Sequence, residues 1–194
     1  MKKQLSNVSL VIGLLLTLIA FPASAHDGKN KLRAKMSSSQ EVPLISAGGE
    51  GEFEASIDSD TSVSFKLSYE GLEGGNILVA HIHLGKRGTN GGLLTFLCNN
   101  TPVGPQPRPC PAAPATVEGT ITAADIIGPV GQGVSPGQFG EFLRALRNGT
   151  AYANLHTAAF PGGEIRGQIR NDNGRHRGHD NDGGHHDDHG NHDH

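Results

Sequence analysis

The sequence predicts an all-β fold, an antiparallel Greek-key β-sandwich or barrel that carries one or two short helices. Short runs in which apolar and polar residues alternate recur along the chain, and glycine-rich turns separate them. A leader-like N-terminus and a polar C-terminal segment leave residues 26–170 to build the core, which is enough for one domain.

Residues 1–25 are typical of a secretory signal peptide. Two lysines near the start precede an apolar run at residues 8–21, and small residues at 23–25 form a cleavage site. The run is too short for a membrane anchor, so we expect an exported chain that begins at His26 and is periplasmic or extracellular. The remaining chain is mildly acidic and has no basic patch, which argues against a nucleic-acid partner.

Three strands are expected before the first cluster of glycines. Leu32, Ala34 and Met36 alternate with charged residues, which predicts a first strand. Residues 53–57 and 63–69 alternate in the same way on either side of a turn, and this arrangement predicts a hairpin with one wet face.

The next strand, residues 77–84, carries two histidines. Because side chains of a strand alternate between its faces, His81 and His83 share one face and lie about 7 Å apart along the strand. The opposite face is apolar and is expected to enter the core; it consists of Leu78, Ala80, Ile82 and Leu84.

Two further strands, at residues 93–98 and 117–121, precede two short helices. Thr122 and Asp125 have the spacing of a capping box. Ser135 is the expected cap of a second helix, with Pro136 in its first turn, and this helix is expected to end at Gly149. Its apolar face is Phe139, Phe142, Leu143 and Leu146.

The two cysteines, Cys98 and Cys110, bracket a loop rich in proline and turn-forming residues. In an exported chain with two cysteines, a Cys98–Cys110 disulfide is the expected structure. Metal binding by this pair is the alternative.

The last two strands, residues 150–156 and 163–169, place further polar groups opposite the core. His156 and Arg166 lie on the same kind of face as His81 and His83, which makes all four candidates for one shared polar surface outside the core. Three imidazoles that converge there would suit copper or zinc. The groups available to orient the rings are Tyr152, Asn154, Glu164 and Arg166.

Other roles for these residues remain open. His81 and His83 could bond to loop backbone instead of a metal, and Arg166 could form a salt bridge with Glu164 or Glu141. No set of nucleophile, acid and base is evident, so we assign no catalytic residue and no enzymatic activity.

The segment 171–194 contains almost nothing but glycine, asparagine, aspartate, arginine and histidine, so we expect it to be disordered. Such a tract binds nickel, zinc or copper loosely, without a fixed geometry. The alternative is a solubilising tail. Its histidines are His176, His179, His185, His186, His189, His192 and His194.

Four motifs occur in one order along the chain, and together they resemble the CHRD (chordin-type) domain. They are Gln40-Glu41-Val42-Pro43, Ala80-His81-Ile82-His83, Gly149-Thr150-Ala151-Tyr152-Ala153-Asn154-Leu155-His156-Thr157, and Pro161-Gly162-Gly163-Glu164-Ile165-Arg166-Gly167-Gln168. The resemblance covers residues 32–170 and implies a secreted module. The Cys98–Cys110 segment is a departure from the family pattern.

A weaker, local resemblance is to copper/zinc superoxide dismutase. A His-x-His strand, a distant strand histidine and an arginine near the C-terminus are similar to the copper-binding set of that family; here they are His81, His83, His156 and Arg166. The bridging histidine and the zinc loop have no counterpart.

These observations give three functional hypotheses. The first is an exported binding module that holds a transition metal, with copper as the first candidate, at His81, His83 and His156. The second is an enzyme that uses this metal, as the dismutase resemblance implies. The third is a structural or adhesive module that binds extracellular or periplasmic proteins without a metal.

Overall fold

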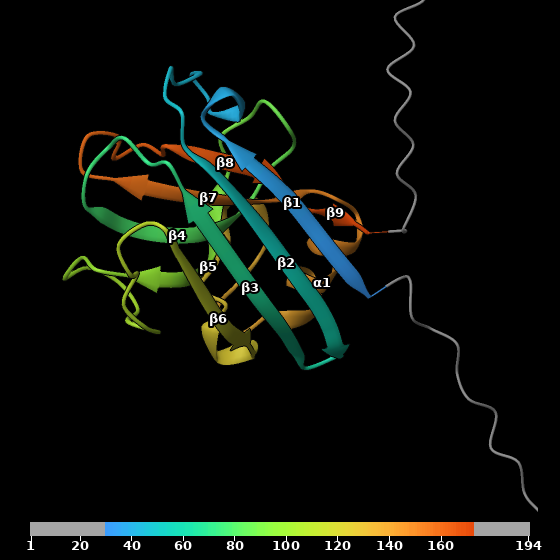
Figure 1. Cartoon of the computed structure of the whole chain (residues 1–194). Helices are drawn as coiled ribbons and strands as arrows, with labels where there is room; N and C mark the ends of the chain where they lie inside the picture. Colours follow the sequence, from blue (N-terminus) through green and yellow to red (C-terminus); the bar gives the residue numbers. More distant parts are fainter. Residues whose placement is uncertain (1–29, 173–194) are drawn as a thin grey trace, which may run out of the picture.

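The computed structural model describes residues 30–172, which form one antiparallel sheet folded into two layers (Figure 1). The strands are β1 Lys31–Ser37, β2 Glu50–Ser59, β3 Ser62–Glu70, β4 Ile77–Leu84, β5 Gly92–Asn99, β6 Ala115–Ile121, β7 Ala151–Thr157, β8 Ile165–Gln168 and β9 Arg170–Asn171. Their order is β5-β4-β7-β8-β1-β2-β3-β6, with β9 paired to β1. The sheet is therefore nearly closed, and the all-β antiparallel class is confirmed.

The first layer contains β1, β2, β3 and β6. The predicted hairpin is β2 and β3, which pair antiparallel along their length, with Phe53 opposite Leu67. Alternation buries Phe53, Phe65 and Leu67, while their neighbours Glu54 and Lys66 are exposed. One face of this layer therefore covers the core, and the other is open to water.

The second layer contains β5, β4, β7 and β8, and in Figure 1 its strands run across those of the first layer. Ala80, Ile82 and Leu155 enter the core between the layers, as alternation predicts. The prediction for Leu78 was wrong, because Ile77 takes that place in the core. A register shift between Ile77 and Val79 changes which residues face inward at the start of β4.

One α-helix packs against the core. Helix α1, Phe139–Arg147, buries Phe142 and Leu146 against the core, and Gly149, with φ of +64°, follows its end as predicted. Three short 3-10 helices accompany it: η1 Ser38–Gln40, η2 Ala123–Asp125 and η3 Val130–Gln132. The capping box of Thr122 and Asp125 is present at η2.

The predicted cap at Ser135 was wrong, because α1 begins four residues later. Residues 135–138 form a turn in which the backbone N–H of Ser135 donates to Gln138 Oε1 over 2.8 Å. Gly137 has φ of +80°, which a continuing right-handed helix cannot contain.

The predicted Cys98–Cys110 disulfide is present and closes a loop with a sequence separation of 12. Both cysteines belong to the core cluster. Asn99 holds the same loop, since its side-chain N–H donates to Val103 O over 2.8 Å.

Reduction of this disulfide is expected to lower the free energy of unfolding by about 2–3 kcal/mol, because it frees a loop of that length in the unfolded chain. Urea unfolding with and without reductant measures the difference. The Cys98→Ala/Cys110→Ala variant should be insensitive to reductant, and an equal response in that variant would contradict the assignment.

The described chain extends slightly into the segment expected to be a tail. Asn171 is part of β9, and the backbone N–H of Asp172 donates to Lys31 O over 2.8 Å. The expected leader, His26 and the seven tail histidines lie outside the described residues. Within residues 30–172, no helix has the length and hydropathy needed to span a membrane.

Candidate metal site

His81, His83 and His156 meet on the face of the second layer that points away from the core. Strands β4 and β7 are paired so that His81 lies opposite Asn154, and His156 lies opposite Val79. Alternation on both strands then directs all three imidazoles to one face. One ring nitrogen from each histidine lies within 4.8 Å of the others.

Hydrogen bonds fix the orientation of two of the rings. His83 Nδ1 lies 3.1 Å from Gly91 O, and His156 Nδ1 lies 2.9 Å from Pro161 O. A carbonyl oxygen only accepts, so both Nδ1 atoms carry the hydrogen in a neutral ring and both Nε2 atoms present a lone pair. The bond to loop backbone considered for His83 therefore exists, and it leaves the second nitrogen free.

The third ring completes a set of nitrogen donors. His81 Nδ1 lies 3.4 Å from His156 Nε2. Two nitrogens bound tetrahedrally to one ion at 2.0–2.1 Å stand about 3.4 Å apart, so this separation suits a shared ion. His81 Nε2 and His83 Nε2 are buried and have no hydrogen-bond partner.

Burial keeps the three imidazoles neutral. Desolvation, followed by the nearby His156 and His83, lowers the pKa of His81 to about 3. Desolvation likewise lowers the pKa of His83 to about 4, against the opposing effect of its bond to Gly91, and lowers the pKa of His156. Neutral imidazole is the form that binds a metal ion.

Aromatic rings and one guanidinium surround the cluster. The ring of Tyr152 lies parallel to that of His83, with centroids 5.0 Å apart, and the ring of Phe96 meets His81 edge-on at 4.4 Å. The guanidinium carbon of Arg166 lies 3.8 Å from the centroid of the Tyr152 ring. Cation–π attraction at this distance holds the stack together.

The polar surface predicted outside the core is only partly open to water, because the loop between β4 and β5 packs over part of it and leaves His83 and His156 half-buried. Arg166 donates to Thr89 O over 2.7 Å and to Asn90 Oδ1 over 3.0 Å, and the backbone N–H of Gly91 donates to the Tyr152 hydroxyl over 3.1 Å. Arg166 is 3% exposed and His81 is 9% exposed. The burial of Arg166 and Tyr152 results from contacts with this loop, and the alternation of residues along a strand cannot predict such contacts.

Glu164 and Asn154, the other two residues expected to orient the histidine rings, differ in their surroundings. Glu164 is fully buried, and its carboxylate accepts from the backbone N–H groups of Glu73 and Gly74 and from the Thr157 hydroxyl. Asn154 is the cross-strand neighbour of His81, and its Oδ1 is buried without a partner.

The carboxylate near Arg166 is Glu41, not Glu164 or Glu141 as we considered. Glu41 Oε2 lies 4.0 Å from Arg166 Nη1, and both side chains are almost completely buried. Burial raises the pKa of Glu41 to about 7, even though Arg166 acts in the opposite direction.

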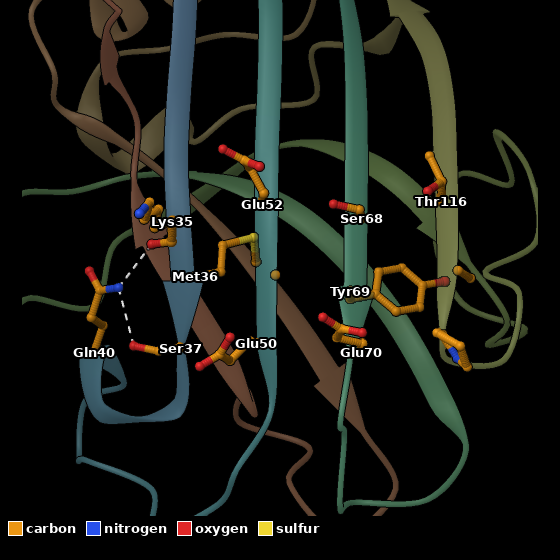
Figure 2. A pocket seen from close by; sticks show the side chains of 13 residues that line it. Lys35, Met36, Ser37, Gln40, Glu50, Glu52, Ser68, Tyr69, Glu70 and Thr116 are labelled. Atoms are coloured by element: carbon orange, nitrogen blue, oxygen red, sulfur yellow. Dashed lines mark hydrogen bonds between the residues drawn. The ribbon is translucent and has the colours of Figure 1, made fainter. Parts of the chain in front are cut away.

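A hollow of about 790 Å³ lies elsewhere, on the wet face of the first layer. Figure 2 shows its side chains, with Gln40 donating to Lys35 O and Ser37 Oγ. Most of its charged side chains are exposed, and none of its lining atoms is buried without a partner. Within residues 30–172, the side chains that could hold a metal ion are therefore those of the histidine cluster and not those of this hollow.

A family model described as the CHRD domain matches residues 32–169 of the 194-residue chain. The chain belongs to the CHRD domain family. The match includes both histidine strands of this CHRD domain and the strand that carries Arg166. No curated protein and no solved structure matches the chain, so the dismutase resemblance gains no support.

Sequence reasoning did not find three contributors to the site of this CHRD domain. Gly91 and Pro161 act through backbone carbonyls, which no side-chain pattern reports. Phe96 belongs to a strand whose pairing with β4 shifts on both sides of the His81–Phe96 pair, so its position beside His81 could not be derived from alternation. The PGG turn at 161–163 was visible as a motif, but its role was not.

Proposed function

We propose that this CHRD domain is an exported metal-binding module that holds one copper ion through His81, His83 and His156. The supporting observation is the set of three imidazoles with lowered pKa values, one ring nitrogen of each lying within 4.8 Å of the others. Imidazole nitrogens are suitable ligands for copper, which makes copper the first candidate. The disulfide and the family membership are consistent with a role outside the cytoplasm.

The histidine-rich tail is proposed as an accessory collector that binds copper, zinc or nickel weakly and raises the local metal concentration near the domain. It supplies seven imidazoles within one short segment. Other periplasmic or extracellular proteins would deliver the metal to such a module or take it up from the module.

A copper titration of two matched chains tests the proposed site. The parent is a full-length chain in which the seven tail histidines are replaced by asparagine, and we expect it to retain one copper per chain after gel filtration. The His81→Gln/His83→Gln variant of this parent should retain less than a tenth of that amount, because loss of two of three ligands weakens binding steeply. Elemental analysis of the eluted protein provides the measurement.

Thermal unfolding serves as the control, since both chains must be folded for the comparison to hold. Tyr69→Phe is the control substitution. Tyr69 is buried on β3 in the first layer, away from the histidines, and its hydroxyl donates to Pro111 O. This substitution should leave copper uptake unchanged. Uptake by the histidine variant equal to that of the parent would refute the proposed site.

A further inference from the structure

The proposed ligand set carries no negative charge. Among residues 30–172, the only group of three or more metal-binding side chains that converges is the three histidines. The two buried carboxylates nearby are already engaged. Glu164 accepts from two backbone N–H groups and a hydroxyl, and Glu41 lies 4.0 Å from Arg166. An ion at this site would therefore keep its full charge.

A fixed positive charge lies one aromatic ring away from the cluster. Strand β7 lies between β4 and β8, so the ring of Tyr152 has His83 on the β4 side and Arg166 on the β8 side. The guanidinium is 3.8 Å from the Tyr152 centroid, and the His83 centroid is 5.0 Å from it. The bonds of Arg166 to Thr89 and Asn90 hold the guanidinium in this place.

We propose that Arg166 is a specificity-determining residue that biases the histidine site toward monovalent copper and against divalent ions. This inference rests on the proposed function. Repulsion between the guanidinium and a bound ion is proportional to the charge of the ion. At a separation of about 10 Å and an effective dielectric constant of about 20, one additional elementary charge lowers affinity by roughly tenfold.

Monovalent copper and Zn²⁺ make the sharpest comparison. Both ions have a filled d shell and no geometric preference from d electrons. Their difference in softness acts through the three imidazoles, which are the same in every variant, so a change in their relative affinity between variants reports the difference in charge. The quantity to measure is the ratio of the association constants for monovalent copper and Zn²⁺. Competition with protons for the imidazoles affects both constants in the same way and cancels in this ratio.

The experiment uses the full-length parent without tail histidines, under anaerobic conditions with a reductant. Competition with bicinchoninate measures monovalent copper, and competition with a fluorescent chelator measures Zn²⁺. At pH 6, where Glu41 is mostly protonated and does not cancel the arginine charge, Arg166→Gln should lower the ratio about tenfold, mainly through tighter Zn²⁺ binding. Arg166→Lys retains the charge and should keep the ratio within about threefold of the parent.

Arg108→Gln is the matched control. Arg108 also lies over an aromatic ring, that of Phe65 in the first layer, and donates to a backbone carbonyl, that of Glu118. This variant should leave the ratio unchanged. A parent-like ratio in a folded Arg166→Gln chain that still binds both ions would overturn the inference.

Glu41→Gln provides a second test in case Arg166→Gln does not fold. This near-isosteric change removes the charge that partly balances Arg166, so at pH 8 it should raise the ratio severalfold. An unchanged or lower ratio would overturn the inference independently. A parent that binds neither ion at the histidines would instead refute the proposed function, which separates the two failures.

Discussion

In the metal-free protein, the free energy of unfolding is expected to fall by about 2 kcal/mol between pH 6 and pH 5. Burial lowers the pKa of His81 to about 3 and that of His83 to about 4, and it also lowers the pKa of His156. An unfolded histidine has a pKa near 6.5. In this interval the unfolded chain therefore binds about two protons at His81 and His83 that the folded chain does not, and the lowered pKa of His156 adds to this difference. Stability consequently decreases as the pH falls.

Glu41 acts in the opposite direction. Its pKa is raised to about 7 in the folded protein and is 4.5 when unperturbed, so near pH 5.5 the folded chain holds a proton that the unfolded chain has released. The net uptake on unfolding is then between one and two protons, which corresponds to roughly 1.4–2.7 kcal/mol per pH unit. We therefore expect a slope of about 2 kcal/mol per pH unit.

Urea unfolding at half-unit steps from pH 7 to pH 5 measures this slope with a chelator present. The matched variant is His81→Gln/His83→Gln/His156→Gln, which leaves Glu41 as the shifted group. Its stability should rise as the pH falls from 7 to 5, so the sign of the slope is reversed. The same slope in both proteins would show that the buried imidazoles do not cause the pH dependence.

Replacement of Gly167 by alanine is expected to lower the free energy of unfolding by about 4 kcal/mol. Gly167 lies on β8 next to the point where the two layers join, and β1 and β8 are paired there through Ser37 and Arg166. A Cβ on Gly167 would stand 2.3 Å from Lys35 O and 2.8 Å from Lys35 C. Because these are backbone atoms of β1, the added methyl group would force the two strands apart.

Gly140→Ala is the matched control, since Gly140 lies on the exposed side of α1 and a Cβ there would meet nothing within 4 Å. This change should raise stability by about 0.5–1 kcal/mol through the higher helix propensity of alanine. Chemical denaturation of the two variants under the same conditions gives both values. A loss below about 1 kcal/mol for Gly167→Ala would contradict the prediction, because it would mean that β1 and β8 can move apart at little cost in free energy.

Local patterns along the chain were sufficient for most strands. The alternation at residues 77–84 predicts β4 with its observed bounds, and the hairpin of β2 and β3 follows from two alternating runs around a turn. These predictions succeed because a strand between water and a core must alternate. They fail where pairing shifts, as at Ile77, or where a turn resembles a helix cap, as at Ser135.

The sequence by itself determined which side chains share a face of a strand. It therefore determined that His81, His83 and His156 lie on the faces opposite the hydrophobic core. Only the tertiary structure decided that β4 and β7 are neighbours, that the β4–β5 loop contacts His83, Tyr152 and Arg166, and that Glu41 lies beside Arg166. The physical reason is that alternation is a local consequence of backbone geometry. Strand pairing, burial by loops and the resulting pKa shifts depend on contacts between residues far apart in the chain.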